Sequence, residues 1–205
     1  MPNTWDPFAL EPELGLQRLI EGNQRFIDGT AAPRGGFDAQ KMAAPQKPFA
    51  IVLGCSDSRT PVEILFDQGF GDLFVVRIAG NIVAPSGVGS IEFAASVFGT
   101  RLVVVMGHTG CGAIAATVQA MSGNGPASKN LRSITDRITP HIEGIAHANS
   151  GPETMRAAMR ANVRASVDHL RHGSQILEEL VLKGRLKIVG SEYDLETGRV
   201  NFFDY

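Results

Sequence analysis

Residues 102–112 read LVVVMGHTGCG, an unbroken aliphatic run that ends in a glycine, histidine and cysteine cluster. A run that is apolar at every position is typical of a parallel strand covered on both faces. Similar runs, rich in Val, Ile and Phe, lie at residues 49–53, 73–78 and 186–189. With residues 102–106 as the third strand along the chain, the sequence predicts a four-stranded, mostly parallel sheet.

Helical patterns alternate with these strands, which predicts an α/β fold with right-handed crossovers and helices on both faces of the sheet. The segment ETGR at 196–199 predicts a hairpin turn into an antiparallel edge strand at residues 200–203. The expected helices are residues 61–68, 87–98, 112–121, 129–141 and 152–183, the last of them possibly broken by Gly173.

The whole chain, residues 1–205, is expected to form a single domain. Residues 10–28 carry apolar side chains at helical spacing, so residues 1–30 predict an N-terminal helical arm. Residues 31–48, rich in Pro and Gly, predict a connector. Such an arm would either reach a neighbouring subunit or pack on its own, and the sequence does not choose between them.

Composition argues against several classes of function. The net charge is −2 and there is no basic block, so we expect no nucleic-acid partner. The longest aliphatic run is too short to cross a membrane. Residues 1–14 lack the basic region and long apolar stretch of a secretory signal, so we expect a cytoplasmic protein. In that reducing compartment, two cysteines favour metal ligands or reactive thiols over a disulfide.

Both cysteines follow expected strands. Cys55 comes after the first strand, and His108 and Cys111 come after the third. Sites in such sheets form at the carboxyl ends of the strands. Two thiolates and an imidazole suit zinc and leave a fourth position open when the site is catalytic. Each residue taken alone would be an ordinary core group, but their conjunction predicts one Zn²⁺ per chain.

Two further residues stand beside the expected zinc ion. Asp57 is close enough to Cys55 to fill or guard the fourth position, and Arg59 would hold its carboxylate in a bidentate pair. The sequence TPVE at 60–63 has the form of a capping box, which would pin this loop to a helix N-terminus. Cys111 would open another helix, whose dipole favours a thiolate.

The sequences CSDSR at 55–59 and GHTGCG at 107–112 resemble the two signature motifs of the β-class carbonic anhydrases. The similarity covers residues 12–203 and includes QKP at 46–48, GDLFVVR at 71–77, AGN at 79–81 and GSIEF at 89–93. It implies a zinc-dependent lyase that interconverts CO₂ and bicarbonate, with Cys55, His108 and Cys111 as ligands. Asp57 and Arg59 would form the dyad that orients zinc hydroxide for attack on CO₂. In a closed form Asp57 would be the fourth ligand.

The same resemblance implies a substrate site. Gln46 and the backbone N–H of Gly112 would contact the oxygens of CO₂ or bicarbonate. An apolar pocket would be lined by Phe74, Ala79 and Phe93.

One subgroup of the family has an inhibitory bicarbonate site that requires a Trp three residues before the first cysteine. Here that position is Val52, and the single Trp of the chain is Trp5. Arg77 and Tyr193 match the other parts of that site, but without the Trp we do not expect it to operate.

The resemblance implies a homodimer or a dimer-based tetramer, with each active site at the subunit boundary and the N-terminal helix across the partner. Three alternatives stay open. A carbonyl sulfide or carbon disulfide hydrolase would use the same ligands. A non-catalytic zinc or bicarbonate sensor would not need the Asp57–Arg59 pair. A flavodoxin-like nucleotide binder, suggested by GVGS at 87–90, lacks the spacing of a phosphate-binding loop.

Overall fold

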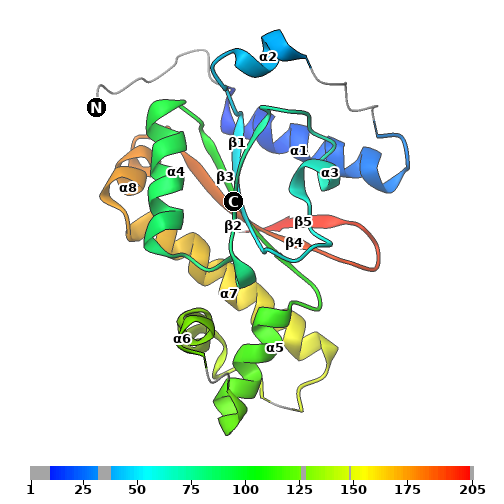
Figure 1. Ribbon diagram of the computed structural model, residues 1–205, viewed down its shortest axis with the longest axis vertical. Helices are drawn as coiled ribbons and strands as arrows, with labels where there is room; N and C mark the ends of the chain where they lie inside the picture. Colours follow the sequence, from blue (N-terminus) through cyan, green and yellow to red (C-terminus); the bar gives the residue numbers. More distant parts are fainter. Residues whose placement is uncertain (1–9, 32–37, 126–127, 148, 204–205) are drawn as a thin grey trace.

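The computed structural model describes residues 10–31, 38–125, 128–147 and 149–203. It contains one five-stranded sheet in the order β2-β1-β3-β4-β5 (Figure 1). Four strands are parallel, and β5 pairs antiparallel with β4 at the edge, as predicted. The strands are β1 (Ala50–Gly54), β2 (Leu73–Arg77), β3 (Leu102–His108), β4 (Lys187–Tyr193) and β5 (Val200–Phe203).

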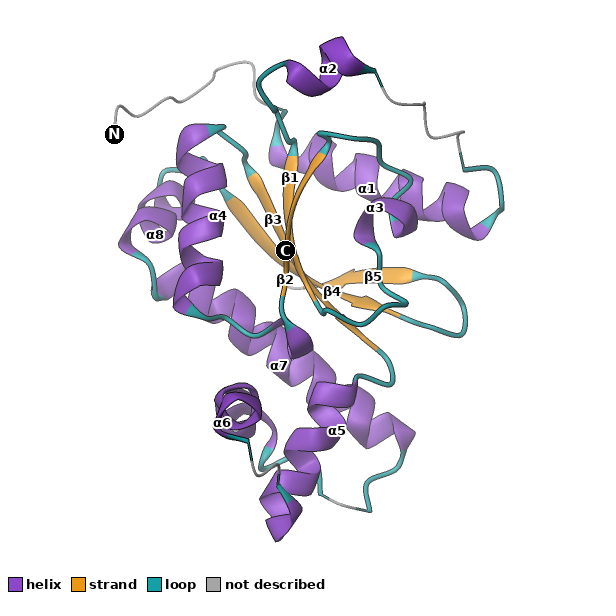
Figure 2. Ribbon diagram, in the orientation of Figure 1, coloured by secondary structure: helices purple, strands orange, loops and turns teal. Residues whose placement is uncertain are grey.

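Helices cover both faces of the sheet (Figure 2). Helices α1 and α3 lie on one face and α4, α7 and α8 on the other, while α5 and α6 lie beyond the carboxyl ends of the strands. The helices are α1 (Pro12–Ile27), α2 (Ala39–Ala43), α3 (Val62–Leu65), α4 (Pro85–Val97), α5 (Gly112–Gln119), α6 (Lys129–Ile142), α7 (Pro152–His172) and α8 (Gln175–Leu182). None of these helices is long and apolar enough to cross a membrane.

The central strands are buried on both sides, which is why their sequences are apolar throughout. Along β1, Ile51 and Leu53 face the layer of α4 and α7, while Val52 faces the layer of α1 and α3. Each of these three side chains is at most 1% exposed. The burial therefore confirms the interpretation of an unbroken aliphatic run as a covered parallel strand.

Helix α1 packs against its own sheet, one of the two arrangements that the sequence left open. Leu16 and Leu19 are buried in the core of that face. The side chain of Asn23 donates hydrogen bonds to the backbone carbonyls of Leu65 and Gly198. On its other side the helix exposes Leu14, which is 59% accessible.

Several predicted boundaries were wrong. The helix expected at 61–68 is only the four residues of α3, since Asp67 adopts a positive φ of 48°. The predicted capping box does not form, because the hydroxyl of Thr60 donates instead to the backbone carbonyls of Cys55 and Asp57. The helix expected at 112–121 ends at Gln119 and continues as a π-helical turn.

The structure also settles the connector and the long helix near the C-terminal end of the chain. The expected connector contains the short helix α2, which we did not predict. The helix expected at 152–183 is divided at Gly173, as the sequence suggested, and the hydroxyl of Ser174 caps α8 by accepting from the N–H of Leu177.

Candidate metal centre

Three potential ligands meet at the carboxyl ends of β1 and β3. Cys55 directly follows β1, His108 is the last residue of β3, and Cys111 is the N-cap of α5. All three are buried, and their ligand atoms lie within 4.8 Å of one another. In the described ranges no other group of three His, Cys, Asp or Glu side chains converges in this way.

The imidazole of His108 presents a free nitrogen to the two sulfurs. Its Nδ1 lies 2.9 Å from the carbonyl oxygen of Thr109, so Nδ1 carries the proton and donates. In the neutral imidazole Nε2 is then an acceptor, and it is buried without a hydrogen-bond partner among the described residues. Leaving such an atom unpaired is costly, and a metal ion at this point would satisfy it.

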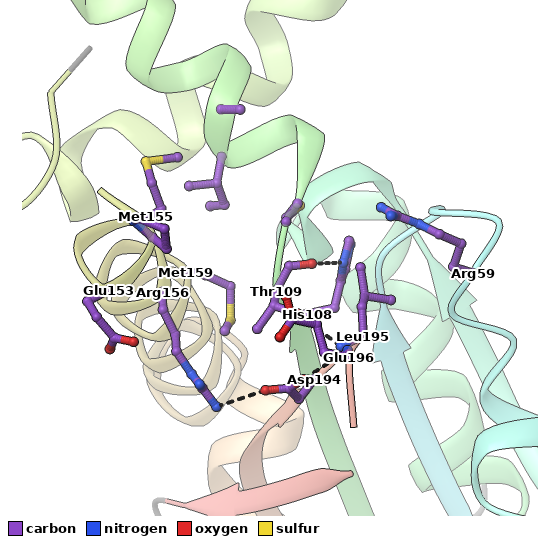
Figure 3. Close-up of a pocket in the computed structure, with 15 residues that line it drawn as sticks. Arg59, His108, Thr109, Glu153, Met155, Arg156, Met159, Asp194, Leu195 and Glu196 are labelled. Carbon is purple, nitrogen blue, oxygen red and sulfur yellow. Dashed lines mark hydrogen bonds and ion pairs between the residues drawn. The ribbon is translucent and has the colours of Figure 1, made fainter. Parts of the chain in front are cut away.

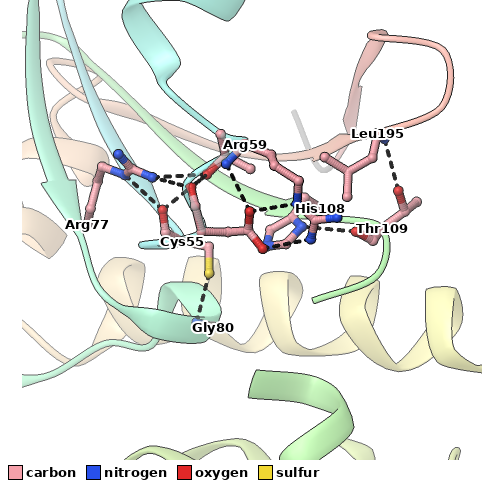
Figure 4. A network of polar contacts seen from close by, with 9 residues as sticks. Cys55, Arg59, Arg77, Gly80, His108, Thr109 and Leu195 are labelled. Atoms are coloured by element: carbon pink, nitrogen blue, oxygen red, sulfur yellow. Dashed lines mark hydrogen bonds and ion pairs between the residues drawn. The ribbon is translucent and has the colours of Figure 1, made fainter. Parts of the chain in front are cut away.

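The carbonyl of Thr109 is itself held in place. The N–H of Thr109 donates to the carbonyl of Tyr193 at 3.0 Å, and its hydroxyl accepts from the N–H of Leu195 at 3.0 Å (Figure 4). The orientation of the His108 ring is thus fixed from the loop that follows β4.

The two thiols share one proton. The pKa of Cys55 is lowered to about 4 because its sulfur accepts a hydrogen bond from the thiol of Cys111. The pKa of Cys111 is raised because its proton is held by that sulfur, because the thiol is buried, and because a second negative charge would lie beside the first. A divalent cation removes this conflict, and thiolate and imidazole donors at this spacing fit Zn²⁺.

The carboxylate of Asp57 borders the cluster. Its Oδ2 lies 3.9 Å from Nε2 of His108. Arg59 binds it in a fork, with Nε to Oδ1 at 2.9 Å and a terminal nitrogen to Oδ2 at 2.8 Å. These hydrogen bonds from Arg59 hold the pKa of Asp57 well below its usual range, so the carboxylate is ionised.

Arg77 anchors the loop that carries Cys55 and Asp57. Its Nε donates to the carbonyl of Cys55 at 2.9 Å, and a terminal nitrogen donates to the carbonyl of Asp57 and to the hydroxyl of Thr60 (Figure 4). This role of Arg77 was not predicted from the sequence, because the register that sets Arg77 beside Gly54, the residue before Cys55, is a property of the folded sheet.

A cavity of about 570 Å³ opens beside His108 and Cys111 (Figure 3). Part of its wall is apolar and includes Met155, Met159 and Leu195. Such a wall suits a small uncharged molecule. At the far side Arg156 pairs with Asp194 at 3.4 Å, and the lining there also includes Glu153 and Glu196.

A family model described as carbonic anhydrase matches residues 50–200. Carbonic anhydrase 2 of Mycobacterium tuberculosis is 36% identical over 207 residues, which cover 100% of this chain and 96% of the relative. A β-carbonic anhydrase of Coccomyxa, solved in complex with acetazolamide, superposes with a TM-score of 0.70 at 26% identity, over 95% of this chain and 86% of that one. The chain belongs to the β-class carbonic anhydrase family.

Other members agree with this assignment. The carbonic anhydrase of Mycolicibacterium smegmatis is 37% identical over 202 residues, covering 98% of this chain and 94% of the relative. A structure of tetrameric β-carbonic anhydrases from Sordaria macrospora superposes with a TM-score of 0.71 at 25% identity, over 81% of this chain and 85% of that one. This chain is thus an enzyme of a family whose general reaction is the hydration of CO₂.

The substrate residues expected of a β-carbonic anhydrase fall into two groups. Gly112 begins α5 directly after Cys111, and Ala79 begins a 3₁₀ turn whose next residue contacts Cys55. Phe74, Phe93 and Gln46 lie elsewhere, and none of these five residues is among those that line the cavity of Figure 3.

In this carbonic anhydrase Phe74 lies on β2, Phe93 lies on α4, and Gln46 lies in the loop before β1. Phe74 packs 6.1 Å from the ring of Phe98, measured between centroids, and Phe93 on α4 is 45% exposed. Gln46 is exposed. The structure therefore brings together the expected zinc ligands and the Asp57–Arg59 pair, but not the whole expected substrate pocket.

The positions that correspond to the inhibitory bicarbonate site make other contacts in this carbonic anhydrase. Val52 is fully buried in β1, and Arg77 is bound to the Cys55 loop. Tyr193 is buried and pairs in register with His108. Trp5 lies outside the described residues.

Proposed function

We propose that this carbonic anhydrase interconverts CO₂ and bicarbonate at one zinc ion held by Cys55, His108 and Cys111. The observation that carries the proposal is the buried Nε2 of His108, which has no hydrogen-bond partner in the described part of the chain and faces two thiol sulfurs. Bound zinc supplies the Lewis acid that makes water a nucleophile near neutral pH. The apolar wall of the adjacent cavity supports CO₂ as the substrate, since that molecule carries no charge.

We infer that Asp57 and Arg59 act as a catalytic dyad. Asp57 Oδ2, close to the ligand cluster, accepts a hydrogen bond from the attacking water and directs its lone pair at the carbon of CO₂. Arg59 keeps Asp57 ionised and holds it to one side. If Arg59 released the carboxylate, Asp57 would be free to bind the metal as a further ligand, and the site would be closed to substrate.

We propose that the working unit is a homodimer or a dimer-based tetramer. The relatives from Sordaria macrospora are described as tetrameric. Phe93 and Gln46 are exposed and lie away from the cavity of their own subunit, which supports their use at the partner's site. The substrate pocket then consists of Gly112 and Ala79 from one subunit with Phe93 and Gln46 from its partner. Two free cysteines at the proposed metal site favour a reducing compartment, so we place the enzyme in the cytoplasm.

Stopped-flow CO₂ hydration on metal-analysed protein tests this function. We expect one zinc per chain, activity that is lost on chelation and recovered with zinc, and no zinc in Cys55→Ser. Asp57→Asn should keep the zinc and lose about 100-fold in kcat/KM, since the attacking water is no longer oriented. Asp28→Asn, which changes an exposed carboxylate at the end of α1, is the matched control and should retain full activity.

The same preparation distinguishes the other candidates. Carbonyl sulfide or carbon disulfide hydrolysis faster than CO₂ hydration would assign the protein to those substrates. Zinc at one per chain with no turnover of any of the three would leave a binding protein and overturn the proposal.

A further inference from the structure

A backbone N–H group points at one of the two cysteine sulfurs. The N–H of Gly80 donates to Sγ of Cys55 at 3.3 Å, from the 3₁₀ turn Ala79–Asn81 (Figure 4). Gly80 has a φ of 69°, and a Cβ there would lie 2.9 Å from side-chain atoms of both Ala113 and Ile138. The turn is thus wedged between Cys55 and helices α5 and α6, in a conformation that favours glycine.

Two side chains of helix α7 donate hydrogen bonds to the backbone of this turn. Asn162 Nδ2 donates to the carbonyl of Gly80 at 2.8 Å, and Ser166 Oγ donates to the carbonyl of Asn81 at 3.2 Å. The two side chains are one helical turn apart, and the residues are 2% and 5% exposed. Because both carbonyls are fixed, the backbone around Gly80 has little freedom to turn its N–H away from the sulfur.

We propose that Asn162 is a positioning residue of the metal centre, which aims the N–H of Gly80 at Cys55 and is assisted by Ser166. The inference rests on the zinc site proposed above. A hydrogen bond to a ligating thiolate reduces the charge that the sulfur donates and fixes its direction, and partners of this kind contribute strongly to metal affinity. Asn162 touches neither the proposed ligands nor the Asp57–Arg59 pair, so its effect passes through Gly80.

The test compares two buried asparagines. Asn162→Ala should lower the zinc affinity, measured by competition with a chelator, by about 10- to 100-fold. In cobalt-substituted protein it should also shift the sulfur-to-cobalt charge-transfer band, which reports directly on the thiolates. Asn23→Ala removes an equally buried amide, 3% exposed, that bonds to two backbone carbonyls far from the site. This control should lower thermal stability and leave both metal readouts unchanged.

Ser166→Ala gives a second, milder variant, because it removes a single 3.2 Å hydrogen bond from the same turn. It should shift both readouts in the same direction as Asn162→Ala, by less, and it decides the matter if Asn162→Ala does not fold. Zinc affinity and cobalt spectra that match wild type in the folded variants would overturn the inference and leave Asn162 a purely structural residue. Failure of the wild-type protein to bind zinc would be a different result, and it would overturn the proposed function.

Discussion

Nε of Arg77 lies 2.9 Å from the backbone carbonyl oxygen of Cys55. One side chain at the end of the edge strand β2 therefore fixes the loop that follows the neighbouring strand β1. A terminal nitrogen of Arg77 also donates hydrogen bonds to the carbonyl of Asp57 and to the hydroxyl of Thr60. The loop that bears Cys55 and Asp57 is thus held at two backbone carbonyls and one hydroxyl by a single side chain.

Arg77→Met should weaken both the fold and the metal site. The variant leaves the carbonyls of Cys55 and Asp57 without their charged donor, at a cost of about 2 kcal/mol in the free energy of unfolding. We expect zinc affinity to fall as well, since the loop gains freedom. Urea unfolding and chelator competition measure the two effects. Arg18→Met breaks an ion pair with Asp72 and should leave zinc affinity unchanged; an equal loss in both variants would contradict the anchoring role of Arg77.

Gly107→Ala should disturb the site through packing. A Cβ at this position, next to His108, would lie 2.5 Å from Sδ of Met159 and 2.7 Å from a methyl group of Val163. Helix α7 must then move away from β3, which we expect to cost about 1–3 kcal/mol in the free energy of unfolding and to lower activity. Met159→Ala makes room for that Cβ, so in thermal unfolding the double variant should lose less stability than the sum of the two single variants. Losses that simply add would show that the clash is not with Met159.

The carboxylate of Asp194 should make stability depend on pH. Burial would raise its pKa, but hydrogen bonds from the backbone N–H groups of Thr197 and Glu196, with the charge of Arg156, lower the pKa below the ordinary Asp value. A lowered pKa means that the ionised form stabilises the fold fully above the ordinary Asp value and that this contribution is lost as the pH falls through the folded value. The unfolding free energies of wild type and Asp194→Asn should therefore differ near neutral pH and converge below about pH 4. A difference that stays constant down to acid pH would rule out this carboxylate as the source.

Glu192 should be among the most sensitive charged positions in the fold. Its carboxylate is 0% exposed on β4 and pairs with Arg156 and Arg160 from α7. Glu192→Ala leaves two guanidinium groups facing a buried gap, which we expect to cost about 3–5 kcal/mol in the free energy of unfolding by urea. The exposed carboxylate of Glu179, paired with Lys183, offers the comparison, and Glu179→Ala should leave unfolding unchanged within error.

The sheet could be predicted from the sequence because a strand covered on both faces must be apolar throughout. The predicted strands at 49–53 and 73–78 match β1 and β2 to within one residue. The strand at 186–189 was too short, because β4 continues through Ser191 and the charged Glu192. The arginines of α7 that make burial of Glu192 tolerable lie more than thirty positions away, so a local pattern could not show it.

The grouping of Cys55, His108 and Cys111 could be predicted for the same reason, since each lies at or just after the end of a recognisable strand. Its supporting contacts could not. Thr60 is a good capping residue by local rules, yet its hydroxyl serves the carbonyls of Cys55 and Asp57. Asn162 is one polar residue in a long helix, and only the tertiary fold brings it to the turn at Gly80.

The pairing of β1 with β3 has a consequence for how the enzyme is assembled in the cell. Cys55 and His108 are 53 residues apart in sequence, and the helix α4 and the edge strand β2 lie between them. A metal ion that joined them would close a long loop of chain, and the pairing of β1 with β3 is what brings these ligands together. Its binding free energy is then added to that of the finished fold. We therefore expect the metal to bind late in folding, when it stabilises a sheet that is already formed. The supply of metal should then influence how long the enzyme survives proteolysis.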